Sequence, residues 1–235
     1  MKAILDHVED VAENIKTFWF KPEGTVRYEA GQFTELYLPH DNHDDRGIKR
    51  WFTISSSPVD PLISITTKFA VDRSSTFKQT LLQLKPGTEV MLADPMGDFV
   101  LPKDKSIPLL FVAGGIGVTP VHSMVKYLSD THEQRDIQLL YAANHDNELA
   151  FKGLFESYEL RDLSYVIHEP SPAWKGEVGS LTTDRILKAI NGSGDMIIYL
   201  SGPEPMVETF DKELKAAGIN KHRLVTDFFP GYKPF

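Results

Sequence analysis

The chain has 235 residues, of which 41% are hydrophobic and 25% are charged, a composition typical of one large or two modest globular domains. A formal net charge of -8 argues against a nucleic-acid or anionic-membrane surface as its main function. Because there is no cysteine, disulfides, thiolate zinc sites and cysteine-ligated iron–sulfur clusters are excluded within it, and redox chemistry would need an organic cofactor or a haem. It shows no apolar run of membrane-spanning length and no apolar signal region, so we expect a cytoplasmic location.

The first part of the chain carries short β-branched or aromatic runs separated by proline, glycine and aspartate, which predicts a small antiparallel β-barrel. Its expected strands are residues 17–20, 32–38, 51–54, 62–68 and 89–92. One helix is expected over residues 75–84, followed by a stop at Pro86-Gly87. The apolar face of that helix would consist of Phe77, Leu81, Leu82 and Leu84.

The segment 101–108 is polar, flanked by prolines and without a hydrophobic pattern, so we expect two domains, residues 1–104 and 105–235, to meet within it. Beyond this segment short apolar strands alternate with helical stretches, which is the pattern of a doubly wound parallel sheet in an α/β domain. The strands are expected near residues 109–113, 137–142, 164–168, 195–200 and 222–226. The helices are expected near residues 119–129, 147–159, 180–190 and 204–217.

The first strand of the second part leads into a glycine-rich turn, Gly114-Gly115-Ile116-Gly117-Val118-Thr119-Pro120. The glycines permit positive φ and the close approach of a ligand to the backbone. We expect the Thr119 hydroxyl to cap the next helix and Pro120 to take its first position. A helix N-terminus placed in this way favours an anion such as a pyrophosphate. Taken alone, the stretch is also compatible with an ordinary tight strand-to-helix turn.

A second loop, Ser201-Gly202-Pro203-Glu204-Pro205-Met206, follows the fourth expected strand of this sheet. Ligands of doubly wound sheets bind beyond the carboxyl ends of the strands, where this loop supplies a hydroxyl and bare backbone. The alternative for this loop alone is a helix start that binds nothing.

In the first part, Arg50-Trp51-Phe52-Thr53 combines the side chains that a flavin dinucleotide requires. An arginine fork suits phosphate oxygens, an aromatic ring offers a stacking plane, and a hydroxyl reaches ring heteroatoms. On a strand, Arg50 and Phe52 share a face that also includes Ile54. A barrel strand with a surface arginine is the alternative.

Three separated stretches resemble, in the right order, the motifs of the ferredoxin-NADP reductase family. Arg50 to Thr53 is similar to Arg-x-Tyr/Phe-Ser/Thr, and Gly114 to Pro120 is similar to Gly-Gly-x-Gly-x-Thr-Pro. Ser201 to Met206 is similar to Cys-Gly-Pro-x-x-Met, with serine in place of cysteine. The resemblance runs nearly end to end and implies an antiparallel barrel that holds FAD, followed by an α/β domain that binds NAD(P)H.

By this resemblance Arg50 would pair with the FAD pyrophosphate, Phe52 would lie against the flavin, and Thr53 would hydrogen-bond near flavin N5. Residues 65–68 resemble the family's next flavin-contacting strand, and residues 74–76 stand at the helix start that binds the pyrophosphate, without the family's glycine there. The FAD-binding residues implied are Arg50, Phe52, Thr53, Ile54, Thr67, Lys68, Ser74, Ser75 and Thr76.

The resemblance likewise implies the residues that frame the nicotinamide nucleotide, which are Gly115, Gly117, Thr119, Ser201, Gly202, Pro203 and Met206. Thr226-Asp227-Phe228-Phe229 resembles the family's carboxylate-x-aromatic terminus, in which a ring covers the flavin until the nicotinamide displaces it. Phe229 is the expected ring, and Tyr232 or Phe235 could serve instead. The catalytic residues implied are Thr53, Ser201, Asp227 and Phe229.

Two acidic features remain. The stretch His40-Asp41-Asn42-His43-Asp44-Asp45 has metal-ligand residue types but no fixed partner, so we expect a solvated loop and no metal site. Glu169 follows the third strand of the second part, where NADP-specific relatives place groups for the adenosine phosphate. Its carboxylate would repel a phosphate and bind a ribose hydroxyl, which favours NADH over NADPH.

The function implied is that of an FAD-dependent oxidoreductase, in which NAD(P)H gives hydride to flavin N5 and electrons pass to a second acceptor. Ferredoxin, flavodoxin or another small redox protein, a quinone and a dedicated partner are all compatible acceptors. An electron-transfer subunit of a larger oxidoreductase is one alternative. A non-catalytic nucleotide-sensing module without flavin is another, and the intact Arg50 to Thr53 motif argues against it.

Overall fold

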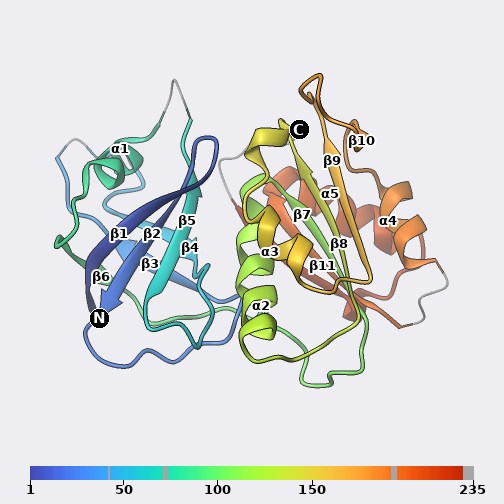
Figure 1. The fold of residues 1–235 in the computed structure, drawn as a ribbon, viewed down its shortest axis with the longest axis horizontal. Coiled ribbons are helices and arrows are strands. Elements are labelled where there is room, and N and C mark those ends of the chain that lie inside the picture. The colour runs from blue at the N-terminus through green and yellow to red at the C-terminus, as the bar shows by residue number, and fades with distance from the viewer. Residues whose placement is uncertain (42, 71–73, 192–194, 230–235) are drawn as a thin grey trace.

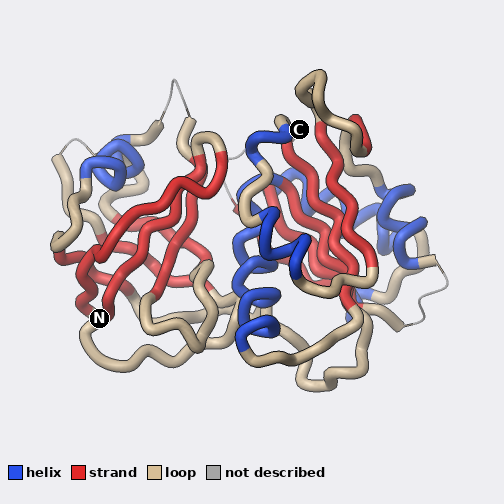
Figure 2. The backbone as a smooth tube through the Cα atoms, viewed as in Figure 1, coloured by secondary structure: helices blue, strands red, loops and turns tan. Residues whose placement is uncertain are grey.

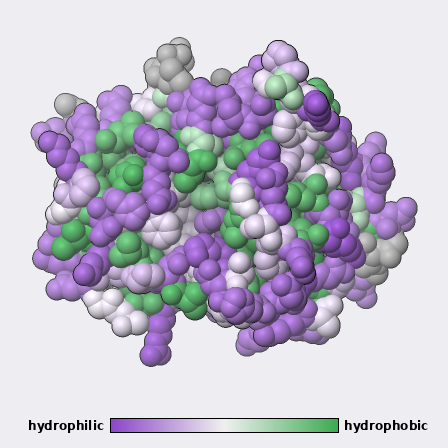
Figure 3. Space-filling model, in the orientation of Figure 1, coloured by the Kyte–Doolittle hydropathy of each residue, from purple (hydrophilic) through white to green (hydrophobic). Residues whose placement is uncertain are grey.

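The computed structural model describes residues 1–41, 43–70, 74–191 and 195–229. Two lobes lie side by side (Figure 1), and Figure 2 shows that strands dominate the first while strands and helices alternate in the second. Hydrophilic side chains cover most of the face seen in Figure 3, with hydrophobic groups scattered between them. None of the helices described is both long enough and apolar enough to cross a membrane.

The first lobe is built on an antiparallel sheet that curls into a barrel. Its strands are β1 (Lys2–Ala12), β2 (Ile15–Pro22), β3 (Phe33–Tyr37), β4 (Lys49–Thr53), β5 (Ile63–Lys68) and β6 (Glu89–Leu92). Their order is β4-β3-β6-β1-β2-β5, and a bridge between Ile54 and Ile65 connects the two edges. The expected barrel is therefore confirmed, and its interior is filled by large apolar side chains such as Phe18, Phe20 and Leu36.

Strand β1 was not predicted from the sequence. It contains several acidic residues, Asp6, Glu9 and Asp10, and such residues are depleted in strands. Two irregularities interrupt its register with β2. The strand forms because β2 and β6 flank it on both sides and supply its backbone hydrogen bonds, a long-range effect that local propensity does not report.

The expected helix is α1 (Thr76–Gln83), and the Ser75 hydroxyl caps it by accepting a hydrogen bond from the Lys78 N–H. Phe77 and Leu81 are buried as expected. Leu82, placed on the same apolar face by the sequence analysis, is 43% exposed, because successive helical residues lie about 100° apart and Leu81 already faces the core.

The second lobe is a parallel sheet with helices on both faces, as expected. Its strands are β7 (Leu109–Gly114), β8 (Ile137–Ala143), β9 (Asp162–Ile167), β10 (Glu177–Val178), β11 (Ile197–Pro203) and β12 (Leu224–Phe229). The order is β10-β9-β8-β7-β11-β12, so the winding reverses between the neighbours β7 and β11. The short edge strand β10 was not predicted.

The helices of this lobe are α2 (Val118–Asp130), α3 (Lys152–Ser157), α4 (Thr183–Ile190) and α5 (Glu204–Ala216). The described residues of this lobe also form the 3-10 turns η1 (Gly115–Gly117), η2 (Asp146–Glu148) and η3 (Lys221–Arg223). The helix expected over 147–159 is shorter because Phe151 takes a left-handed conformation, with φ of 62°. One apolar cluster packs under α2 and α3, and another packs under α4 and α5.

No helix or strand is assigned within residues 101–108, which lie in the connection between the two lobes. The domain boundary expected at residues 104 and 105 falls in this connection and stays a prediction. The lobes also share packing, because Ile15, Ala30 and Phe99 belong to the apolar cluster under α2.

Candidate functional site

The two loops singled out in the second lobe meet at the carboxyl edge of the sheet. They follow the neighbouring strands β7 and β11, in which Ala113 lies opposite Ser201. A Cβ atom added to Gly117 would lie 2.5 Å from Gly202 Cα and 2.5 Å from the Ser201 carbonyl oxygen. A Cβ on Gly114 would lie 2.6 Å from Met206 Sδ. Glycine is therefore required at Gly117, where backbone atoms block a side chain, whereas at Gly114 the flexible Met206 side chain would have to move.

The start of α2 differs from the expectation. The turn η1 precedes the helix, with Gly115 at a φ of 54°, and the N-cap residue is Gly117. Thr119 is the second helical residue, and its hydroxyl donates to the Ile116 carbonyl at 3.0 Å instead of capping. Pro120 is the third helical residue, where a missing N–H still costs nothing because the first turn has no intrahelical acceptors.

Ser201 carries a polar atom with no partner. Its side chain is fully buried, and its hydroxyl has no hydrogen bond within the part of the chain that the structure describes. A buried hydroxyl left unpaired costs about 1 to 3 kcal/mol. A polar ligand group at this edge would remove that cost, so the site suits a ligand with a hydrogen-bonding group.

In the first lobe, Arg50, expected at the FAD pyrophosphate, and Phe52, expected against the flavin, both lie near Phe77 in the first turn of α1. The Arg50 guanidinium lies 5.0 Å from the centre of the Phe77 ring. The Phe52 ring lies 6.0 Å from it, centre to centre. The structure thus brings Arg50 and Phe52 next to the helix start formed by residues 74–76, where Ser74 donates to the Ala70 carbonyl and Ser75 caps the helix.

Asp44 holds Arg50, a role that the sequence analysis missed. The Arg50 guanidinium donates to Asp44 Oδ1 at 2.6 Å, and it also donates to the carbonyls of Arg46, Gly47 and Lys49. Hydrogen bonds from Arg46, with the charge of Arg50, lower the pKa of Asp44 to about 2. The loop expected to be merely solvated therefore anchors a site residue. The sequence offered one indication of this role: Asp44 lies six residues before Arg50, with Gly47 between them to allow a turn.

The same loop contains the metal-ligand residue types noted in the sequence. The described residues contain no group of three or more histidine, aspartate or glutamate side chains arranged to hold a metal ion. His40 instead lies against the Leu38 carbonyl at 2.7 Å and the Thr76 hydroxyl at 3.3 Å.

Thr53 and Thr67, from strands β4 and β5, are almost fully buried. Ile54, expected to bind the cofactor, points its side chain into the barrel core, so only its backbone is available to a ligand. The Lys68 ammonium group forms an ion pair with the Glu148 carboxylate of the second lobe, at 2.6 Å. Because η1 packs against β5, the barrel residues and the glycine turn face each other at the seam between the lobes.

The expected carboxylate and ring lie on β12, beside β11. Asp227 lies opposite Ser201, and Phe229 lies opposite Pro203. Burial raises the pKa of Asp227 to about 6, and repulsion from Asp98 adds to the effect while the Phe228 N–H opposes it. Phe229 is half-buried. The alternatives Tyr232 and Phe235 lie outside the described residues.

Two further carboxylates lie beyond the carboxyl ends of β8 and β9. Glu169 follows β9 as expected, and its carbonyl contacts the His145 ring at 2.9 Å. Asp146 accepts hydrogen bonds from the Ser171 N–H at 2.7 Å and from its hydroxyl at 2.9 Å. These bonds lower the pKa of Asp146, which the sequence analysis did not single out.

His122 is a buried titratable group at the seam that the sequence analysis also missed. Its Nδ1 lies 2.8 Å from the Ser55 carbonyl, and its ring stacks on Phe151 with centres 3.7 Å apart. Burial lowers its pKa to about 4, the Ser55 carbonyl opposes this shift, and Lys126 adds to it. One indication of this site was present in the sequence: the polar residues His122 and Ser123 lie on the buried side of α2, next to apolar residues.

Replacing His122 with asparagine is expected to flatten the pH dependence of stability. The unfolded chain binds a proton at His122 below pH of about 6.5, whereas the folded chain does so only near 4. The wild type therefore loses stability as pH falls through this window, by up to about 1.4 kcal/mol per pH unit and about 3 kcal/mol in all. Urea unfolding of both proteins from pH 7 to 4 gives the difference, and two parallel curves would contradict the shift.

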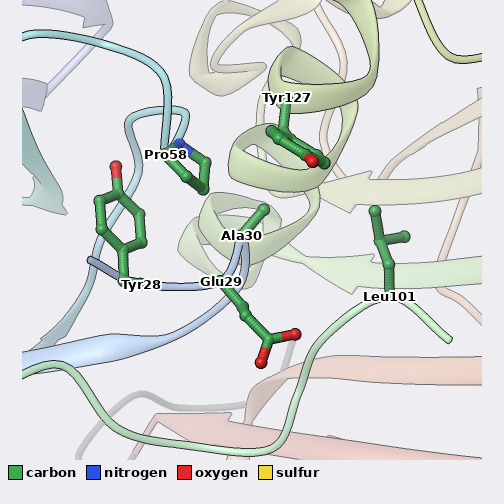
Figure 4. Close-up of a pocket in the computed structure, with 6 residues that line it drawn as sticks. All are labelled: Tyr28, Glu29, Ala30, Pro58, Leu101 and Tyr127. Carbon is green, nitrogen blue, oxygen red and sulfur yellow. The ribbon is translucent and has the colours of Figure 1, made fainter. Parts of the chain in front are cut away.

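A small pocket at the seam lies away from these loops. Its volume is about 140 Å³, and it is lined by Tyr28, Glu29, Ala30, Pro58, Leu101 and Tyr127 (Figure 4). Tyr127 stands eight residues after Thr119 on α2, about 12 Å further along the helix. Since pockets for organic ligands usually measure about 300 to 1,000 Å³, this one does not account for a dinucleotide.

Comparison with known proteins gives matches over both lobes. Residues 111–212 match the family described as oxidoreductase NAD-binding domain. The toluate 1,2-dioxygenase electron transfer component of Pseudomonas putida is 31% identical over 225 residues, which cover 93% of this chain and 64% of the relative. The chain spans between 58% and 65% of the length of four such curated relatives.

Two solved structures share the whole fold. The flavohem-like FAD/NAD binding domain of the nitric oxide dioxygenase from Vibrio cholerae gives a TM-score of 0.83 at 20% identity, over 97% of this chain and 98% of that one. A ferredoxin NADP+ reductase from Neisseria gonorrhoeae, with bound FAD and NADP, gives a TM-score of 0.79 at 16% identity. The match covers 99% of this chain and 98% of that one. The family match covers the second lobe, and the sequence relatives and shared fold extend over both. The second lobe is therefore similar to an oxidoreductase NAD-binding domain, and the chain as a whole shares the fold of a ferredoxin NADP+ reductase.

Proposed function

We propose that this chain is an FAD-dependent oxidoreductase that takes hydride from NAD(P)H and passes electrons to a second acceptor. The observation that carries the proposal is the meeting of three motifs at one seam. Strand β5 with Thr67 packs against the glycine turn, β4 with Thr53 lies beside β5, and the turn packs directly on the Ser201 to Met206 loop. Proximity of two bound rings is the largest contribution such a site can offer to hydride transfer.

The residues of the first lobe fit FAD. Arg50 and the N-terminus of α1 would hold the pyrophosphate, because an arginine fork and the N–H groups of a first helical turn both bind phosphate oxygens. Phe52 and the hydroxyls of Thr53 and Thr67 would orient the flavin. When bound, FAD supplies the chemistry, since it accepts a hydride at N5 and releases electrons singly. Ser74, Ser75, Thr76, Lys68 and the backbone of Ile54 remain part of this proposal.

The residues of the second lobe fit the nicotinamide end of the nucleotide. Gly115, Gly117 and Thr119 would lie along it on one side, and the Ser201 to Met206 loop on the other. The unpaired Ser201 hydroxyl would gain a hydrogen bond from a polar ligand group. Asp227 would exchange a proton beside Ser201, because its pKa of about 6 leaves both protonation states accessible near neutral pH. Phe229 would cover the flavin when no nucleotide is bound.

The adenosine end favours NADH in this proposal. A 2′-phosphate beyond β8 and β9 would meet the carboxylates of Asp146 and Glu169, whereas a ribose hydroxyl could donate to one of them. Ser171, which could otherwise bind a phosphate, is already bonded to Asp146 through both its N–H and its hydroxyl.

The second acceptor would be a redox protein or domain. The relative from Pseudomonas putida is named as the electron transfer component of a dioxygenase, which supports a role as the reductase part of a larger oxygenase system. Ferredoxin and flavodoxin remain compatible acceptors, and the cytoplasmic location stays a prediction.

An anaerobic absorption titration tests the proposal. The purified protein, loaded with FAD, is expected to show flavin bands that bleach on addition of NADH, with NADPH less efficient in a parallel sample. Bands that do not bleach with either nucleotide would favour a subunit that needs its partner or another reductant. A protein that retains no FAD after loading and gel filtration would refute the flavoenzyme and support a nucleotide-sensing module.

A further inference from the structure

One face of α2 carries two buried polar side chains, His122 and Ser123, where the helix meets the first lobe. They are 8% and 0% exposed. Both lie one turn after Thr119 on the same helix face, because residues three and four positions apart are neighbours on a helix. This face therefore runs from the proposed nucleotide site to the seam with the barrel.

The two side chains bind consecutive carbonyls of the first lobe. His122 Nδ1 lies 2.8 Å from the Ser55 carbonyl oxygen, which can only accept, so Nδ1 carries the proton. The Ser123 hydroxyl donates to the Ser56 carbonyl at 2.6 Å and accepts from the Gly31 N–H at 3.4 Å. We call His122, Ser123 and these two carbonyls the carbonyl clamp.

The barrel holds its half of the carbonyl clamp rigidly. The Ser55 hydroxyl bonds to the hydroxyls of Ser64 and Thr66, each at 2.8 Å. The Ser56 hydroxyl bonds to Tyr28 and accepts from the Ser64 N–H, both at 2.9 Å. Such a buried and paired network fixes its members in one arrangement. Ser55 follows Thr53 by two residues, so the fixed segment continues directly from β4.

The second lobe holds its own half. The His122 ring stacks on Phe151, with centres 3.7 Å apart and an angle of 21° between the planes. Phe151 keeps a left-handed φ of 62°, which a residue with a side chain retains only when its surroundings enforce it. The same connection carries Glu148, whose carboxylate binds Lys68 of β5 at 2.6 Å.

We propose that His122 and Ser123 are positioning residues for hydride transfer, which fix the distance between the barrel site at Thr53 and the nucleotide site at Thr119. This inference rests on the proposed function. Each half of the carbonyl clamp is rigid, so its two hydrogen bonds set how closely the lobes approach. A misplacement of about 1 Å between reacting rings can cost about 100-fold in rate, so a contact outside the ligand sites can control the reaction.

The test is the limiting rate of flavin reduction in anaerobic stopped flow, at saturating concentrations of the nucleotide that reduces the wild type faster. His122→Leu removes the donor and is expected to lower this rate about 10- to 100-fold, with FAD content and nucleotide affinity nearly unchanged. His122→Asn places an amide N–H near the position of Nδ1 and is expected to restore the rate to within about threefold of wild type. A nucleotide deuterated at C4 should show a larger isotope effect with His122→Leu.

Two more variants complete the design. Lys126→Met removes a partly buried ion pair with Asp60 across the same seam, outside the carbonyl clamp, and is the control, expected to react at the wild-type rate. If His122→Leu does not fold, Ser123→Ala takes its place, and its limiting rate of flavin reduction is expected to be at least about threefold lower than that of the wild type. Rates within twofold of wild type in the folded clamp variants would overturn the inference. A wild type whose flavin is never reduced would instead refute the proposed function.

Discussion

Replacing Gly117 with alanine is expected to destabilise the protein by about 2 to 3 kcal/mol and to weaken nicotinamide nucleotide binding at least about tenfold. The added Cβ would lie 2.5 to 2.6 Å from backbone atoms of Ser201 and Gly202, which cannot move aside as a flexible side chain would. The two loops must therefore separate, and the Ser201 hydroxyl moves with them. Urea unfolding and nucleotide titration measure the two effects.

Gly153→Ala is the matched control for this substitution. Among the described residues, no atom outside its chain neighbours and its own helix backbone lies within 4 Å of the added Cβ. The residue is in helix α3, where alanine is favoured over glycine by about 0.5 to 1 kcal/mol. We expect this variant to be as stable as the wild type or slightly more stable, with unchanged nucleotide affinity. If Gly117→Ala behaved in the same way, the packing of the two loops would not be what requires the glycine.

Replacing Arg50 with alanine is expected to weaken FAD binding about 10- to 100-fold, because charge-assisted hydrogen bonds contribute about 1.5 to 3 kcal/mol. Arg50→Lys keeps the charge but loses the planar fork, so it should fall between alanine and wild type. Equilibrium titration of the apoprotein with FAD, followed by flavin fluorescence, gives the three dissociation constants.

Arg50 also holds the loop that contains Asp44, so its loss could act indirectly. Asp44→Asn separates the two explanations, because it removes the ion pair and leaves the guanidinium in place. Retained FAD affinity in Asp44→Asn, together with a loss in Arg50→Ala, would assign the effect to a direct contact. Equal losses in both variants would assign it to the loop.

The sequence by itself determined the architecture. Both lobes, most of their strands and the helices α1, α2, α4 and α5 follow from local patterns, because hydrophobic periodicity and turn residues act over a few positions. The glycine turn could also be predicted from the sequence, because three glycines directly after a buried strand indicate a tight turn. Strand β1 could not be predicted in this way, because it depends on pairing with β2 and β6.

The tertiary structure decided how the motifs meet. Gly117 and Gly202 touch across 85 positions, a constraint that no local pattern expresses. Asp44 and His122 gained their roles in the same way, through partners that folding brought to them. The shifted pKa values of His122 and Asp227 arise from burial, which is a property of the whole fold. A sequence specifies which groups are available, and only the packed chain fixes the distances and the solvent exposure that give them their chemistry.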